Sequence, residues 1–164
     1  AVMTGESLEN VTGRGTGIDD AQLSRKRAVI ARALRVNQPR AEDGLDVLSK
    51  VGGFEIGGIA GLILGAAAAR KPVLVDGFIS TAGALIAAAL CPPAREYMIA
   101  SHRSKEPGHA AMLDRLGRKP LLNLDLRLGE GTGAALAMPL VEAAAAVLTR
   151  VATFDEAAVS KANA

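Results

Sequence analysis

Small aliphatic residues supply almost all of the apolar content of this chain. Hydrophobic residues account for 49% of its 164 residues, yet aromatic residues account for only 2%. A core built from Ala, Gly, Leu and Val relies on close approach of main chains rather than on large side chains. Helices laid flat on a sheet meet this requirement, and the length suits one such domain better than two.

Short apolar runs alternate with helical patterns along the chain, and the first two runs end in polar residues. Apolar runs that predict strands lie at residues 72–77, 97–102 and 121–124. Helical spacing of apolar residues predicts helices at 19–36, 45–50, 54–69, 80–90, 110–116, 134–149 and 154–160. We therefore predict an α/β fold, with part of a doubly wound, mostly parallel sheet of about three strands flanked by Ala/Gly-rich helices. In such sheets, ligands bind beyond the carboxyl ends of the strands.

The domain organisation follows from these patterns. Residues 1–18 are Gly- and Thr-rich without an apolar period, which predicts a loop or a truncated N-terminal segment. Residues 19–150 are predicted to form the α/β core, and residues 151–164 a C-terminal helix and tail.

One predicted helix, at residues 54–69, has an unusual content of glycine. Gly57, Gly58, Gly61 and Gly65 lie close to one face of it. Glycine inside a helix costs about 1 kcal/mol relative to alanine, so we expect another main chain to approach this face closely. Tight packing is favoured over ligand contact. The glycines and Glu55 would make a poor membrane span, so we interpret residues 51–69 as a buried helix of a soluble protein.

Charge and cysteine content argue against several classes of protein. The 19 basic and 17 acidic residues nearly balance, and no basic stripe with interleaved aromatics predicts binding to nucleic acid. Cys91 stands alone, which excludes an intramolecular disulfide, fits a reducing compartment and suggests a structural role. Residues 1–6 lack the basic stretch and apolar run of a signal peptide. We expect a cytoplasmic protein that does not bind a membrane.

A glycine-rich segment at residues 12–17 reads Thr-Gly-Arg-Gly-Thr-Gly and precedes a helix that opens with Asp19 and Asp20. Glycines allow backbone N–H groups to surround a phosphate, and a following helix start adds positive potential. Lys26 could add a cation. No predicted strand precedes the segment, so it is not a Rossmann fingerprint. Taken alone, it is better explained as a solvent-exposed loop.

Glu130 is a single carboxylate between glycines, directly before an apolar helix. Glycine neighbours would let the main chain bring this carboxylate close to a ligand, where it could act as a general base. The other interpretation is a helix N-terminus that carries a favourable negative charge. The local sequence supports both equally.

The two histidines, His102 and His109, lie in one polar segment at residues 101–109. Two histidines with one distant cysteine are too few ligands to predict a metal site. No nucleophile motif accompanies them, and we interpret the segment as the polar rim of an active site. We predict neither a metal nor a cofactor.

Five motifs in one order resemble the C-terminal half of the nicotinate-nucleotide–dimethylbenzimidazole phosphoribosyltransferase family. They lie at residues 12–26, 45–56, 75–79, 101–109 and 127–133, and the resemblance extends from about residue 6 to the end. It implies transfer of 5-phosphoribose from nicotinate mononucleotide to 5,6-dimethylbenzimidazole, which gives α-ribazole 5′-phosphate and nicotinate in cobalamin biosynthesis. It also implies a homodimer.

The resemblance further implies roles for individual residues. The glutamate of the Leu-Gly-Glu-Gly motif, here Glu130, would be the catalytic base. Two regions of the chain would line the pocket around the phosphoribosyl and nicotinate groups, together with a polar residue at a strand end. These implied substrate-binding residues are Gly15, Thr16, Gly17, Lys26, Asp76, Ser104, Leu128, Gly129 and Gly131.

The chain also departs from the family it resembles. Family members carry a longer N-terminal half with a Gly-rich phosphate loop and most of the wall that binds benzimidazole. We therefore expect the whole enzyme to be active and this chain alone to be poorly active or inactive. Two alternatives stay open: a non-catalytic module that binds a nucleotide or a partner subunit, and a related transferase that acts on another base.

Overall fold

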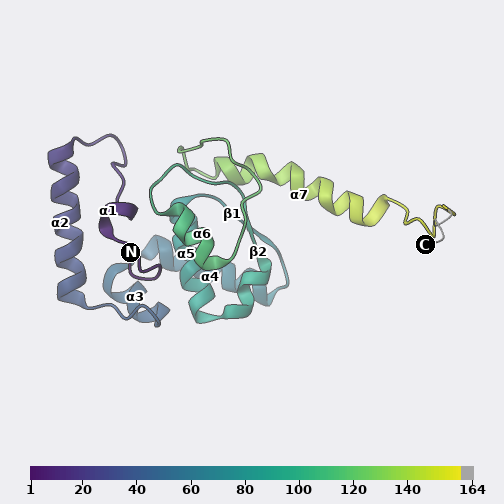
Figure 1. The fold of residues 1–164 in the computed structure, drawn as a ribbon. Coiled ribbons are helices and arrows are strands. Elements are labelled where there is room, and N and C mark those ends of the chain that lie inside the picture. The colour runs from purple at the N-terminus through teal and green to yellow at the C-terminus, as the bar shows by residue number, and fades with distance from the viewer. Residues whose placement is uncertain (160–164) are drawn as a thin grey trace, which may run out of the picture.

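The computed structural model describes residues 1–159 and places seven α-helices, one 3₁₀ helix and two strands in them (Figure 1). The elements in order are α1 (Leu8–Val11), α2 (Asp20–Asn37), α3 (Gly44–Val51), α4 (Phe54–Ala68), β1 (Val73–Val75), α5 (Phe78–Leu90), η1 (Pro92–Tyr97), β2 (Met98–Ala100), α6 (His109–Leu116) and α7 (Thr132–Arg150). Helix α2 lies at one end of the elongated molecule, and α7 extends from the other (Figure 1).

The two strands β1 and β2 pair in parallel, and α5 connects them. The predicted α/β class is thereby confirmed. The predicted third strand at residues 121–124 is wrong in extent, because Leu122 forms only an isolated parallel bridge with His102. The N–H groups of Leu121 and Leu122 donate to the carbonyls of Ala100 and Ser101, after which the segment leaves the sheet.

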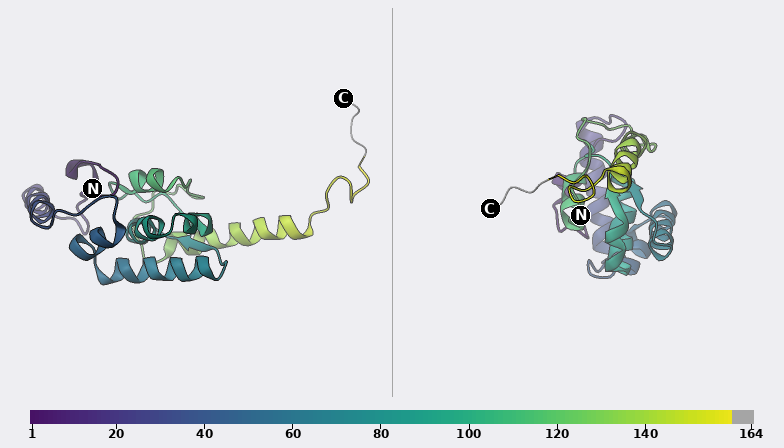
Figure 2. Two further views of the ribbon diagram at one scale, coloured as in Figure 1. Left: turned by 90° about the horizontal axis from the view of Figure 1, so that it is seen from below. Right: turned by 90° about the vertical axis from the view of Figure 1, so that its right-hand side faces the viewer.

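Helix α5 forms the centre of the hydrophobic core. It lies between α4 and α6 (Figure 2), and more than half of its residues are buried. Ala84, Ala87 and Ala88 are almost fully buried, so their short side chains let neighbouring helices come close to the α5 main chain. This arrangement agrees with the prediction of a core of small residues.

The expected close contact on the glycine face of α4 is wrong. A Cβ atom placed on Gly58, Gly61 or Gly65 would meet no atom within 4 Å, and one on Gly57 would make only ordinary contact, at 3.5 Å, with the Leu48 side chain rather than with a main chain. Only Ala60 and Ile63 of α4 are buried, so the helix is not the buried one we expected. The close approach between α4 and α5 occurs instead at Gly83.

Gly83 should therefore be the glycine of this helix pair that tolerates substitution least. A Cβ atom there would lie 2.5 Å from Cγ2 of Ile59 and 3.3 Å from the Ile56 carbonyl oxygen. We expect Gly83→Ala to lower the free energy of unfolding by about 1–3 kcal/mol through overpacking. The control Gly61→Ala should raise it by up to about 1 kcal/mol, because an exposed helical site gains propensity. Urea denaturation of both variants tests the pair, and a stable Gly83→Ala protein would contradict the packing.

The two ends of the described chain also differ from expectation. Residues 1–18 contain the one-turn helix α1, capped by the Ser7 side chain, and Val2 and Met3 pack against the core. The prediction of a helix at residues 154–160 is wrong. Residues 154–158 form turns with exposed side chains, and residue 160 lies outside the described residues.

Helix α7 makes few contacts over most of its length. Within residues 1–159 it is the one helix long and apolar enough to cross a membrane, judged by length and composition, and 11% of that stretch is buried. A single helix of this kind is weak evidence for a membrane span. The segment considered as a membrane span from the sequence, residues 51–69, is not this helix.

Candidate functional site

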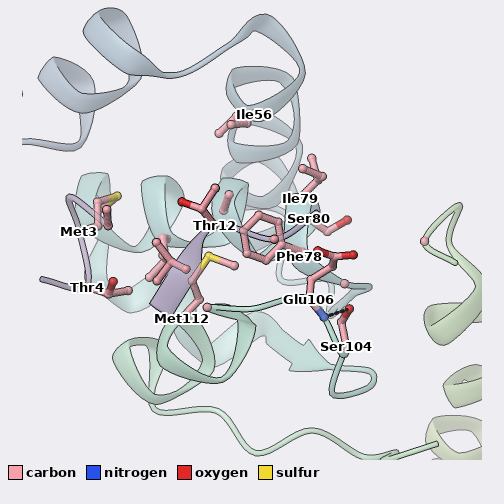
Figure 3. A pocket seen from close by; sticks show the side chains of 18 of the residues that line it. Met3, Thr4, Thr12, Ile56, Phe78, Ile79, Ser80, Ser104, Glu106 and Met112 are labelled. Carbon is pink, nitrogen blue, oxygen red and sulfur yellow. Dashed lines mark hydrogen bonds between the residues drawn. The ribbon is translucent and has the colours of Figure 1, made fainter. Parts of the chain in front are cut away.

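A cavity of about 920 Å³ opens beyond the carboxyl ends of β1 and β2. Its polar part is formed by the segments that follow the two strands, together with the glycine-rich loop near residue 13 and the loop before α7. Apolar side chains, among them Ile56, Phe78 and Met112, line the rest (Figure 3). The cavity thus lies at the sheet edge where ligands bind in parallel α/β folds.

The cavity brings together residues that are far apart in the sequence. Most of the residues that the resemblance assigns to the pocket line it: Gly15, Lys26, Asp76, Ser104, Leu128, Gly129, Glu130 and Gly131. Thr16 and Gly17 do not line it; they lie in a turn in which the Gly17 N–H donates to the Arg14 carbonyl at 3.4 Å.

Two cations hold the main chain of the glycine-rich loop. The Lys26 ammonium donates to the Gly13 carbonyl at 2.8 Å, and the Arg127 guanidinium donates to the Gly15 carbonyl at 3.0 Å. Arg14, in contrast, pairs with the exposed Asp20, and this hydrogen bond lowers the pKa of Asp20. Lys26 and Arg127 therefore bring positive charge to the cavity beside flexible glycine main chain, an arrangement suited to an anionic group.

Glu130 lies in a strained loop at the rim of the cavity. Its φ is 57°, and the adjacent Gly129 and Gly131 also have positive φ values, of 79° and 75°. A left-handed conformation costs a residue other than glycine about 1–2 kcal/mol, and such strain is concentrated at functional sites. The Glu130 side chain is exposed, and within residues 1–159 its carboxylate has no hydrogen-bond or ion-pair partner. It is free to accept a proton from a ligand.

The neighbouring Asp76 has the opposite character. It is buried at the end of β1, and both of its carboxylate oxygens accept hydrogen bonds from the start of α7. The Gly131 N–H donates to one oxygen at 3.2 Å and the Ala134 N–H donates to the other at 3.0 Å. The two carboxylates therefore differ in their surroundings: Glu130 is unpaired at the rim within residues 1–159, and Asp76 accepts hydrogen bonds from the loop that carries Glu130.

Comparison with known proteins shows the family to which the chain belongs. A family model described as phosphoribosyltransferase (DBI_PRT) matches residues 1–159. The chain belongs to this phosphoribosyltransferase family. The chain is 67% identical over 161 residues to the nicotinate-nucleotide–dimethylbenzimidazole phosphoribosyltransferase of Chloroflexus aggregans, and 62% identical to that of Desulforamulus reducens.

Solved structures show the same relationship. The crystal structure of CobT from Thermus thermophilus matches this phosphoribosyltransferase chain with a TM-score of 0.88 at 48% identity, covering 98% of this chain and 49% of that one. The two curated relatives are likewise covered over 98% of this chain and 46% of their own length. The chain thus spans about half the length of the proteins it matches.

One acidic residue of this candidate site was not predicted from the sequence. Glu106 lines the cavity (Figure 3), with its side chain only partly exposed. Its carboxylate lies 3.5 Å from Nε of Arg127. Its N–H donates to the Ser104 hydroxyl at 3.2 Å. The available signal was its position two residues beyond Ser104, in a segment already expected at the ligand-binding edge. Its pairing with Arg127 could not be read from the sequence.

The two histidines of the chain are buried rather than exposed on a rim. His102 lines the cavity, whereas His109 does not. Nδ1 of His109 accepts the Ser104 N–H at 2.9 Å, so Nε2 carries the proton and donates to the Thr81 hydroxyl at 2.9 Å. Burial lowers the pKa of His109 to about 4. Residues 1–159 contain no group of three or more side chains suited to hold a metal ion.

Proposed function

We propose that the whole protein carrying this chain transfers 5-phosphoribose from nicotinate mononucleotide to 5,6-dimethylbenzimidazole. The products would be α-ribazole 5′-phosphate and nicotinate, in cobalamin biosynthesis. The observation that carries the proposal is the unpaired carboxylate of Glu130, which lies on a strained loop at a cavity that also receives Lys26 and Arg127. Support comes from relatives of that name that are 59–67% identical to the chain.

The chemistry of this transfer requires one base and no acid. Nicotinate leaves a cationic pyridinium nucleoside, so its ring nitrogen becomes neutral as the C1′–N bond breaks. One nitrogen of dimethylbenzimidazole forms the new bond to C1′, and the other nitrogen must lose its proton. Glu130 would accept that proton. Glycosidases acting on neutral acetals generally need two carboxylates, whereas a single free carboxylate suffices here.

The substrate-binding roles rest on the lining of the cavity. We propose that Gly15, Lys26 and Ser104, with the main chain of Leu128, Gly129 and Gly131, bind the phosphoribosyl and nicotinate groups. Thr16 and Gly17 border this region in the same loop, and we keep them as candidates that would require the loop to turn inward on binding. Asp76 would act on the loop of Glu130 rather than on a substrate.

Replacement of Lys26 by alanine tests the anion-binding role. We expect KM for nicotinate mononucleotide to rise by about 10-fold or more, because charge-assisted hydrogen bonds contribute about 1.5–3 kcal/mol. Arg25→Ala is the matched control: Arg25 is the neighbouring exposed cation on α2 and does not line the cavity. Steady-state kinetics on the whole protein would contradict the role if both variants gave the same KM.

The overall proposal is tested by incubating the whole protein with nicotinate mononucleotide and dimethylbenzimidazole and measuring nicotinate and α-ribazole 5′-phosphate. Binding of both substrates without release of nicotinate would favour a non-catalytic binding module. Transfer to adenine in preference to dimethylbenzimidazole would favour a related transferase that acts on another base.

We also propose that the whole protein is a cytoplasmic homodimer. The exposed free thiol of Cys91 suits a reducing compartment. Exposed apolar side chains on α4 and α7, such as Phe54 (99% exposed) and Leu148 (86% exposed), suit contact with further polypeptide. Light scattering on the purified whole protein measures the oligomeric state directly.

A further inference from the structure

We propose that His102 is a positioning residue that fixes Asp76 and, through Asp76, the strained loop that carries Glu130. The proposal rests on the proposed function, because it gives the loop its catalytic purpose. The geometry itself joins three elements: the end of β1, the segment after β2 and the first turn of α7.

The hydrogen bonds around His102 determine where its ring proton lies. His102 is 2% exposed, and its Nδ1 lies 3.2 Å from the Ser101 hydroxyl oxygen. That hydroxyl already donates its only hydrogen to the main-chain carbonyls of Val75 and Asp76, at 2.8 and 3.0 Å. It can therefore only accept from His102, so Nδ1 must carry a hydrogen.

The same nitrogen also lies near the carboxylate of Asp76. Nδ1 of His102 lies 3.7 Å from Oδ1 of Asp76, the oxygen that accepts the Ala134 N–H. The other oxygen of Asp76 accepts the Gly131 N–H. Asp76 thus accepts from Gly131, the last left-handed residue of the loop, and from Ala134 in the first turn of α7, while the His102 ring lies beside its carboxylate. An imidazole beside a carboxylate commonly fixes the orientation of that carboxylate.

Steric contact with α7 provides an independent constraint on the ring. A Cβ atom on Gly133 would lie 1.8 Å from Nδ1 and 2.5 Å from Cε1 of His102. The imidazole therefore occupies the space where any other residue at position 133 would place its side chain. The ring serves as a spacer between β1 and α7, and it sets how closely the Glu130 loop approaches the cavity.

The test compares His102→Ala and His102→Asn in the whole protein. We expect the alanine variant to lower kcat by about 10–100-fold with KM for nicotinate mononucleotide within about two-fold, because a shift of about 1 Å can cost 10²-fold. Asparagine places an amide N–H near the position of Nδ1, so it should recover most of kcat. A fall in kcat that asparagine does not recover, or equal loss in kcat and in substrate binding, would overturn the proposal.

His109→Gln is the matched control, because it removes an equally buried imidazole whose hydrogen bonds go to Thr81 and Ser104 rather than to the Glu130 loop. It should lower stability and, because its ring accepts the Ser104 N–H, raise KM for nicotinate mononucleotide, but it should leave kcat within about three-fold because it makes no hydrogen bond to the Glu130 loop. Equal loss of kcat in the His109 and His102 variants would show that His102 only fills the core.

A second kind of variant keeps the His102 side chain but shifts the position of its ring. Gly133→Ala should displace the ring and release the Gly131 and Ala134 amides, which amide hydrogen exchange measures without any substrate. Exchange at these two amides should rise by about 10-fold or more in Gly133→Ala and His102→Ala. Unchanged exchange would overturn the positioning role, even if the whole protein catalysed the proposed transfer. Raised exchange in a protein without transferase activity would instead count against the proposed function alone.

Discussion

Replacement of Glu130 by glutamine in the whole protein is expected to lower kcat for phosphoribosyl transfer by about 10²–10⁴-fold, the usual contribution of a general base. Glutamine has nearly the same size but cannot accept the azole proton. Because the Glu130 carboxylate has no partner in residues 1–159, its loss should leave the Tm and the loop conformation almost unchanged. Measurement of kcat, KM and thermal unfolding on the same sample separates a chemical effect from misfolding.

Two further carboxylates serve as controls for this prediction. Glu142→Gln changes an exposed residue of α7, the helix that follows the Glu130 loop, away from the cavity, and should leave kcat unchanged. Glu106→Gln changes the other glutamate of the cavity, which is paired with Arg127. If Glu106→Gln abolished kcat while Glu130→Gln kept it, the base would be Glu106 and the proposed role of the Gly-Glu-Gly loop would be wrong.

The elements of the fold were largely predictable because their signals are local. Asp19 caps α2 through a capping box with Gln22, and the helix begins at the expected place. The apolar runs before Asp76 and before Ser101 become the two parallel strands. The third strand was not predictable in extent, because pairing at Leu122 depends on the path of a segment that joins the sheet for a single bridge.

The failure at α4 has a different cause. A helix that is apolar around its whole circumference gives no sequence signal for the face that is buried. The glycines of α4 looked like a packing face, yet the contact falls on Ile59, which fills the space above Gly83 of α5. Only the arrangement of the two helices decides which glycine is needed.

The candidate site likewise contains residues that the sequence indicates and contacts that the sequence does not indicate. Glu130, Lys26 and Ser104 follow from short motifs at the ligand-binding edge of the sheet, and the cavity brings them together. The interactions among Asp76, His102 and the α7 main chain span 26 to 58 residues of sequence. No local pattern encodes such contacts, so the support of the Glu130 loop appears only in three dimensions.

Acidification is expected to destabilise the chain through His109. Burial lowers the pKa of its imidazole from 6.5 to about 4. Between these two values the unfolded chain binds a proton that the folded chain does not, so the free energy of unfolding falls as the pH decreases through this window. At about 1.4 kcal/mol for each pKa unit, the full loss is on the order of 3 kcal/mol. Above pH 6.5 and below pH 4, this residue adds no further pH dependence.

Urea denaturation at about pH 7.5 and about pH 4.5, on either side of most of this window, measures this loss, and His109→Gln separates it from other titrations. The variant should be less stable than the parent chain at the higher pH, because it loses the hydrogen bonds to Thr81 and Ser104. Its stability should then change much less between the two pH values.

The pKa of Asp46 is lowered in the folded state by hydrogen bonds from Arg40 and Lys50. That carboxylate therefore loses its stabilising contribution mainly below its unfolded pKa of about 3.8, outside the window. An equal loss of stability in the parent and the variant would show that protonation of His109 does not limit the acid stability of this fold.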